Sequence, residues 1–142
     1  MDQPLVVECT YRAPGDLVWK AITDKDQMKE WYFNLAEFKP VVGFEFQFYG
    51  QDREGKAVLH ACKVTEVITE QRLTYSWCYP EYGGDSYVTF ELKGDGDTTT
   101  VTLTHRGLDT FPVDNPSFAR ESFAEGWTYI IGTSLKGYVE RK

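Results

Sequence analysis

The sequence predicts an α+β domain, in which a curved antiparallel sheet of about six to seven strands carries two short helices and one long C-terminal helix packed across it. Three observations support this class. Residues 5–12 and 44–105 alternate apolar and polar residues over short segments, as strands with one buried face do. Turn-forming residues separate these segments. Residues 117–139 repeat apolar residues with helical spacing, and about 23 residues at about 1.5 Å each span about 35 Å, enough to cross a sheet.

The first elements are one strand and two short helices. Leu5 to Arg12 alternates and predicts a strand, which a Pro-Gly pair ends. Leu17 to Ile22 predicts a short helix with one apolar side. Asp26 is placed to cap a second helix that runs toward Trp31, since an aspartate side chain accepts hydrogen bonds from first-turn N–H groups.

A run of antiparallel strands follows. The clearest segments are Phe44–Tyr49, Val58–Ile68, Leu73–Tyr79, Tyr87–Leu92 and Thr98–His105. Polar turns separate them, and Gly94-Asp-Gly-Asp97 is a strong hairpin signal. This order of short strands and turns is typical of an antiparallel β-meander.

The last helix is amphipathic, and Asn115-Pro116 is predicted to provide its N-cap and a proline at its first position. Its apolar arc consists of Ala119, Phe123, Trp127, Ile130, Ile131, Ser134, Leu135 and Tyr138. The opposite side is predicted to carry Glu121, Glu125, Lys136 and Glu140. Such a helix laid over a curved sheet can enclose a pocket.

Composition excludes several classes of function. The chain of 142 residues is one domain by size, covering 1–142. Its net charge of −7 argues against nucleic acid or an anionic membrane surface as a partner. No apolar run is long enough to span a membrane and no basic-then-apolar leader is present, so we expect a cytoplasmic protein. Cys9, Cys62 and Cys78 are expected to be buried free thiols in a reducing compartment.

Motifs for phosphate, metal and catalysis are incomplete. Residues 50–57 match GxxxxGK, but Ala57 replaces the required hydroxyl and a strand follows where a helix should, so a hairpin turn is predicted. Asp95-Gly-Asp97 has no later acidic ligand for calcium. His60 and His105 have no His or Cys at metal-ligand spacing and no nucleophile–base signature. We therefore expect no metal and no cofactor, and catalysis is disfavoured.

Residues along nearly the whole chain resemble one known superfamily. They are Tyr11-Arg-Ala-Pro14, Val18-Trp19, Ala21-Ile-Thr-Asp24, Trp31, Gly43-Phe44, Glu66-Val67, Arg72-Leu73, Tyr75, Trp77, Thr100–His105, Gly107-Leu108, Gly126-Trp127, Leu135 and Tyr138-Val-Glu140. In this order they resemble the START-like, helix-grip superfamily (also called SRPBCC), in the branch related to the C-terminal domain of the activator of the heat-shock-protein-90 ATPase. The resemblance implies a helix-grip fold. It does not select an activity, because the superfamily includes lipid carriers, cyclases, hydroxylase subunits and co-chaperone domains.

In such a fold the long helix and the concave sheet face each other across a cavity. The candidate ligand-binding residues are Trp31, Phe46, Tyr75, Trp77, Tyr87, Trp127, Ile130, Ile131 and Ser134. The alternative is that these side chains simply pack as core. An empty void of about 300 Å³ would cost roughly 7 kcal/mol, which rivals the stability of a whole domain. The space is therefore expected to be collapsed, wet or occupied.

Three functions remain open. The favoured one is a binding module for a small apolar or aromatic ligand. The second is a stress-related interaction protein that contacts a chaperone. The third is a cyclase- or hydrolase-type enzyme, for which His60, Glu91 or Tyr87 would have to project into the cavity as acid or base. The oligomeric state is left open.

Overall fold

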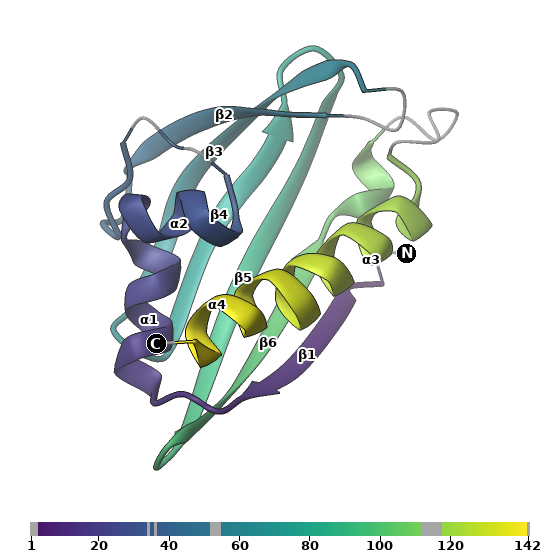
Figure 1. Ribbon diagram of the computed structural model, residues 1–142. Coiled ribbons are helices and arrows are strands. Elements are labelled where there is room, and N and C mark those ends of the chain that lie inside the picture. The colour runs from purple at the N-terminus through teal and green to yellow at the C-terminus, as the bar shows by residue number, and fades with distance from the viewer. Residues whose placement is uncertain (1–2, 34, 36, 52–54, 112–117, 142) are drawn as a thin grey trace.

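In the part of the chain that the structure describes, a six-stranded antiparallel sheet and a long C-terminal helix form two layers (Figure 1). The computed structural model describes residues 3–33, 35, 37–51, 55–111 and 118–141. The strands are β1 (Leu5–Tyr11), β2 (Glu45–Gln51), β3 (Ala57–Ile68), β4 (Arg72–Tyr79), β5 (Gly83–Asp95) and β6 (Thr98–Arg106). They follow the order β1-β6-β5-β4-β3-β2, so β1 and β2 form the edges. The predicted α+β class is confirmed.

The sheet alternates buried and exposed residues as the sequence predicts. β4 is the clearest case, because every second residue from Leu73 to Tyr79 is buried. The β5–β6 hairpin turns at Gly96, where φ is 65°, and Asp95 pairs with Thr98. The GxxxxGK segment leads into strand β3, as predicted, although residues 52–54 lie outside the described part.

Two short helices, α1 (Gly15–Thr23) and α2 (Lys25–Trp31), follow β1. The predicted cap of α2 is wrong by two residues. Asp24 is the N-cap, and its side chain accepts a hydrogen bond from the N–H of Asp26 at 3.1 Å. An N-cap residue needs extended backbone geometry, and Asp24 has it with φ −103° and ψ 119°, whereas Asp26 already lies within the helix.

The C-terminal helix runs without a break through α3 (Arg120–Tyr129), the π-helical segment η3 (Ile130–Leu135) and α4 (Lys136–Glu140). It begins later than predicted, with Ala119 as N-cap, and Asn115 and Pro116 lie outside the described residues. A short 3₁₀ helix, η1 (Leu108–Thr110), follows β6. Figure 1 shows α1 and α2 grouped near the end of the helix at which the chain terminates.

The π-helical segment keeps one face of this helix on the sheet. Phe123, Trp127, Ile131 and Leu135 recur every four residues and are all buried. Four residues of an α-helix overshoot a full turn by about 40°, so such a series would drift off the face. The i→i+5 bonds of a π-helix enclose more residues per turn and reduce that drift.

Side-chain hydrogen bonds hold the π-helical segment in place. The Tyr11 hydroxyl of β1 donates to the Ile131 carbonyl at 2.5 Å. The Ser134 hydroxyl donates to the carbonyl of Trp31, the last residue of α2, at 2.6 Å. Glu140, predicted on the exposed side, has a side chain only 14% exposed and accepts hydrogen bonds from the Arg12 N–H and the Lys136 ammonium.

The three cysteines are free thiols, as predicted, but only Cys62 is buried, whereas Cys9 and Cys78 are partly buried. Within the described ranges, no helix combines the length and apolar character that crossing a bilayer requires.

Candidate ligand-binding site

The space between the concave sheet face and the C-terminal helix contains most of the residues predicted to bind a ligand. Six of the nine are buried there together: Trp31, Phe46, Tyr75, Trp77, Trp127 and Ile131. They come from α2, β2, β4, α3 and η3, so five elements converge on this space. Their burial fits both a ligand site and a ring-packed core.

The other three predicted residues lie elsewhere. Tyr87 is 40% exposed, while its neighbours Ser86 and Val88 are fully buried, so its side chain lies on the outer face of the sheet. Ile130 is half-buried at the side of the helix. Ser134 lines a surface groove of about 450 Å³ together with residues such as Glu30 of α2, and does not face the sheet.

Aromatic rings fill the interior and contact each other across the elements. Trp77 and Trp127 have ring centroids 5.3 Å apart and join sheet to helix. Phe46 meets Tyr75 edge-on at 5.1 Å, and Phe48 meets Trp77 edge-on at 5.7 Å. These distances are typical of favourable aromatic pairs, so the rings form one connected cluster rather than isolated core residues.

Tyr32 and Phe33 belong to this cluster, although they were not predicted to line the site. The Tyr32 and Tyr75 hydroxyls share a hydrogen bond of 2.7 Å. Burial is the main cause that raises the pKa of both phenols well above the ordinary value, so both stay neutral. The available signal was that Tyr32 and Phe33 follow the apolar face of the predicted second helix, next to Trp31.

His60 faces the same interior from β3. Its ring stacks on Phe48 with centroids 4.7 Å apart, and Nδ1 lies 2.9 Å from the Val58 carbonyl. Because a carbonyl only accepts, Nδ1 carries the proton in this contact. Burial lowers the pKa of His60 to about 4, partly opposed by the hydrogen bond to Val58.

A second polar group, not predicted from the sequence, links helix to sheet through three side chains. The Trp127 indole N–H lies 3.0 Å from Nδ1 of His105, and Nε2 of His105 lies 2.9 Å from the Ser86 hydroxyl. That hydroxyl donates to the Trp77 carbonyl at 2.5 Å. Since indole only donates and a carbonyl only accepts, every proton is assigned: His105 is neutral, with its proton on Nε2.

This Ser86–His105 pair has the wrong polarity for nucleophilic catalysis. In a Ser-His-Asp triad the histidine donates from Nδ1 and receives the serine proton at Nε2. Here the Trp127 N–H occupies Nδ1, so Nε2 already carries a proton and cannot accept one. Both residues are also 0% exposed. The pair is therefore a structural link, which we call the Trp127–His105–Ser86 chain.

Replacing Trp127 by phenylalanine should lower the free energy of unfolding by about 2–3 kcal/mol, measured by urea denaturation. The substitution leaves Nδ1 of His105 buried without its donor, which costs about 1–3 kcal/mol, and the smaller ring adds a cavity penalty. Combining it with His105→Phe in a double-mutant cycle separates the two contributions. Strict additivity of the two losses would contradict the role given to the hydrogen bond.

The acid–base candidates do not meet in this interior. Only His60 faces it, because Tyr87 and Glu91 both lie on the outer face. Glu91 forms an ion pair with Arg72 at 3.1 Å, with both side chains more than 40% exposed. In the part of the chain that the structure describes, no group of three or more His, Cys, Asp or Glu residues could hold a metal ion.

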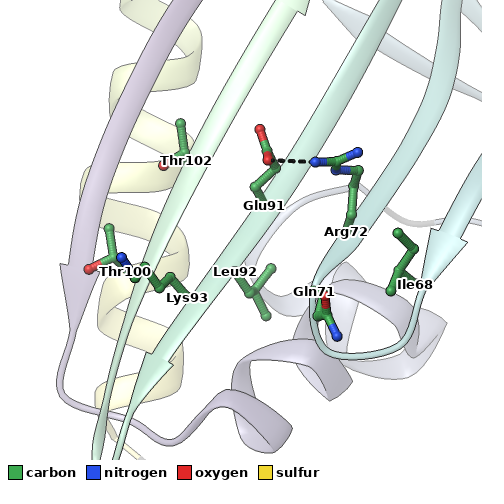
Figure 2. Close-up of a pocket in the computed structure, with 8 residues that line it drawn as sticks. All are labelled: Ile68, Gln71, Arg72, Glu91, Leu92, Lys93, Thr100 and Thr102. Atoms are coloured by element: carbon green, nitrogen blue, oxygen red, sulfur yellow. Dashed lines mark hydrogen bonds and ion pairs between the residues drawn. The ribbon is translucent and has the colours of Figure 1, made fainter.

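A shallow groove of about 360 Å³ lies on the outer face, with the C-terminal helix behind the sheet (Figure 2). It is lined by Ile68, Gln71, Arg72, Glu91, Leu92, Lys93, Thr100 and Thr102. The Arg72–Glu91 pair crosses it, and Thr102 donates to Glu8 at 2.9 Å. These polar groups pair with one another, as expected for a solvated sheet face.

Known proteins resemble this chain in sequence and fold. The sequence profile of the family described as "Activator of Hsp90 ATPase homolog 1-like protein" matches residues 12–140. No protein of curated function matches the chain significantly. The family match confirms the branch of the START-like superfamily that the sequence motifs predict.

Solved structures share the fold over nearly the whole chain. Protein MLL2253 from Mesorhizobium loti is 25% identical, with a TM-score of 0.77 and coverage of 99% of this chain and 98% of that one. Protein Mll3558 from Rhizobium loti is 23% identical, with a TM-score of 0.78 and coverage of 99% and 96%. Protein BH1534 from Bacillus halodurans is 24% identical, with a TM-score of 0.74 and coverage of 97% of each chain.

Proposed function

We propose, from the premise that the chain belongs to the family of activator of Hsp90 ATPase homolog 1-like proteins, that it binds a small apolar or aromatic molecule between the sheet and the C-terminal helix. The observation that carries the proposal is the connected ring cluster under that helix, with hydroxyl, indole and imidazole groups placed among the rings. Ligand sites in proteins are typically apolar and aromatic with a few polar groups that orient the ligand.

The charges of the protein favour a neutral ligand. The described ion pairs, such as Arg72 with Glu91 and Lys136 with Glu140, lie outside the ring cluster, although the Glu140 side chain is only 14% exposed. Among the described residues, the titratable groups that face the interior are tyrosines, histidines and the Cys62 thiol, all held neutral by burial, such as Tyr75 and His60. A charged ligand would lose its hydration there without a charged partner, which is costly.

A thermal-shift panel tests this function. Hexadecanol, cholesterol and naphthalene represent neutral acyl-chain, sterol and aromatic ligands, and a ligand at about 100 times its Kd should add about 2.7 kcal/mol and raise Tm by several degrees. Phe48→Leu, inside the cluster, should change the Kd of an active compound at least about fivefold, the equivalent of roughly 1 kcal/mol. The matched variant Tyr87→Leu, on the outer face, should leave it unchanged. The absence of any stabiliser across the three classes would contradict the proposal.

The family description also supports a second candidate, contact with an Hsp90-type chaperone. Co-purification of the tagged protein with the chaperone of its host tests it, and failure to co-purify at native levels would remove it. Of the three acid–base candidates for the enzymatic alternative, only His60 faces the interior, because Glu91 and Tyr87 lie on the outer face of the sheet.

A further inference from the structure

Tyr32 and Phe33 lie among the rings beneath the C-terminal helix, although they belong to neither a helix nor a strand. α2 ends at Trp31, and Tyr32 leaves helical geometry with φ −126° and ψ −111°. Both residues are only partly buried, although the Tyr32 hydroxyl itself is buried, whereas the strand residue Phe48, which both rings contact, is 4% exposed. Tyr32 and Phe33 therefore lie at the edge of the ring cluster that solvent reaches.

The rings of Tyr32 and Phe33 each pack against other rings of the cluster. The Tyr32 ring stacks on Trp31 at 4.9 Å and lies 6.2 Å from Trp127. The Phe33 ring stacks on Phe48 with centroids 4.3 Å apart and an interplanar angle of 24°. Tyr32 and Phe33 meet each other edge-on at 4.6 Å. Together they fill the space between helix and sheet at the α2 end.

The hydroxyl of Tyr32 completes this arrangement. Tyr75 on β4 is 1% exposed, and its hydroxyl bonds that of Tyr32 at 2.7 Å. A buried hydroxyl requires a partner, and here the partner comes from the segment after α2 rather than from a neighbouring strand. If the Tyr32 ring moved out, an apolar, ring-walled space would remain with the Tyr75 hydroxyl at its base.

Resting on the proposed function, we propose that Tyr32 and Phe33 are an internal occupant of the ligand site, and that the ligand is a hydroxylated aromatic molecule of two rings that displaces them. One ligand ring would stack beside Trp127 and the other on Phe48, as the two side chains do now. The ligand hydroxyl would take over the hydrogen bond to Tyr75.

The affinity of the protein for its ligand then depends on whether the Tyr32 and Phe33 rings occupy the site. The apparent affinity of a ligand is reduced by the fraction of molecules whose site is open, so removing the internal ring should strengthen binding. A hydroxyl on the ligand should also matter, because an apolar ligand would leave the Tyr75 hydroxyl buried without a partner. Both effects are measurable with one matched pair of probes, 4-hydroxybiphenyl and biphenyl.

Calorimetric titration of the intact protein with both probes tests the occupant first. Tyr32→Ala should bind 4-hydroxybiphenyl at least about tenfold more tightly than the wild type, because the place of the Tyr32 ring is vacant. Tyr87→Ala removes a tyrosine from the outer face and should bind as the wild type does. Urea denaturation verifies that each variant folds, and Phe33→Ala, with the same expectation, replaces Tyr32→Ala if that variant is unfolded.

The Tyr32→Ala background then tests the ligand class. Adding Tyr75→Phe should weaken binding of 4-hydroxybiphenyl roughly three- to tenfold and strengthen binding of biphenyl, which then no longer buries an unpaired hydroxyl. Equal binding of the two probes, with and without Tyr75→Phe, would overturn the ligand class and leave the proposed function standing. Unchanged affinity after removal of either ring would overturn the internal occupant. Stabilisation by hexadecanol or cholesterol without binding of either probe would also overturn this inference, whereas no binding of any compound to any variant would overturn the proposed function itself.

Discussion

Replacement of Gly107 by alanine is expected to lower the free energy of unfolding by about 3–5 kcal/mol. Gly107 has φ 85°, a left-handed conformation that costs an L-residue about 1–2 kcal/mol. An added Cβ would also lie 2.4 Å from the Asp85 carbonyl oxygen and 3.0 Å from the Ser86 Cα. Both atoms belong to the backbone of β5, so the clash cannot be relieved by a side-chain rotation and the strand itself must move.

Gly83→Ala is the matched control for this prediction. Gly83 has φ 79°, close to that of Gly107, but a Cβ there would meet nothing within 4 Å. Its substitution should cost only the conformational strain, about 1–2 kcal/mol. Urea denaturation of both variants gives the difference, and equal losses would show that contact with β5 contributes nothing to the requirement for glycine at position 107.

Acidification is the second large effect, and it follows from the two buried histidines. Burial lowers the pKa of His105 to about 3 and of His60 to about 4, both below the ordinary value of about 6.5. Below pH 6.5 the two histidines are therefore protonated in the unfolded chain, whereas in the folded protein they stay neutral until the pH approaches the folded-state values. The stabilisation is complete above pH 6.5 and is lost as the pH falls toward the folded-state values. At pH 4.5 each histidine should have cost roughly 2–3 kcal/mol relative to pH 7.

Urea denaturation between pH 7.5 and 4.5 measures this loss, and His105→Gln assigns half of it. A glutamine amide can accept from the Trp127 N–H and donate to the Ser86 hydroxyl, but it does not titrate. The slope of stability against pH should be smaller in the variant than in the wild type by about 1.4 kcal/mol per pH unit in the acid range. An unchanged slope would contradict a buried neutral His105.

The fold could be predicted from the sequence because local patterns of apolar and polar residues determine it. Alternation placed Leu73, Tyr75 and Trp77 on one face of β4, and helical spacing placed Phe123 and Trp127 on the sheet. The same alternation of apolar and polar residues also indicates which side chains of the following strand, β5, face the helix. Val88, Phe90 and Leu92 alternate there, which puts Tyr87 on the outer face, contrary to the prediction that it lines the cavity.

Local sequence patterns could not predict the polar contacts of the interior. Trp127 forms a hydrogen bond with His105, which lies 22 positions earlier in the sequence. His105 in turn bonds Ser86, which lies 19 positions before it. Tyr32 and Tyr75 are 43 positions apart. Such contacts depend on strand register and on β-bulges, such as the shift between Val64 and Glu66, that periodicity does not specify.

The contacts between the first strand and the last helix also order the folding of the chain in time. Arg120 donates to the Gln3 and Pro4 carbonyls near the start of β1, and Glu140 accepts from the Arg12 N–H just after its end. These contacts join residues 116 to 128 positions apart, and contacts of such separation form slowly. A nascent chain can complete them only after residue 140 has been synthesised. Until then the ring-covered face of the sheet is open to water, which makes this stage the one most exposed to aggregation.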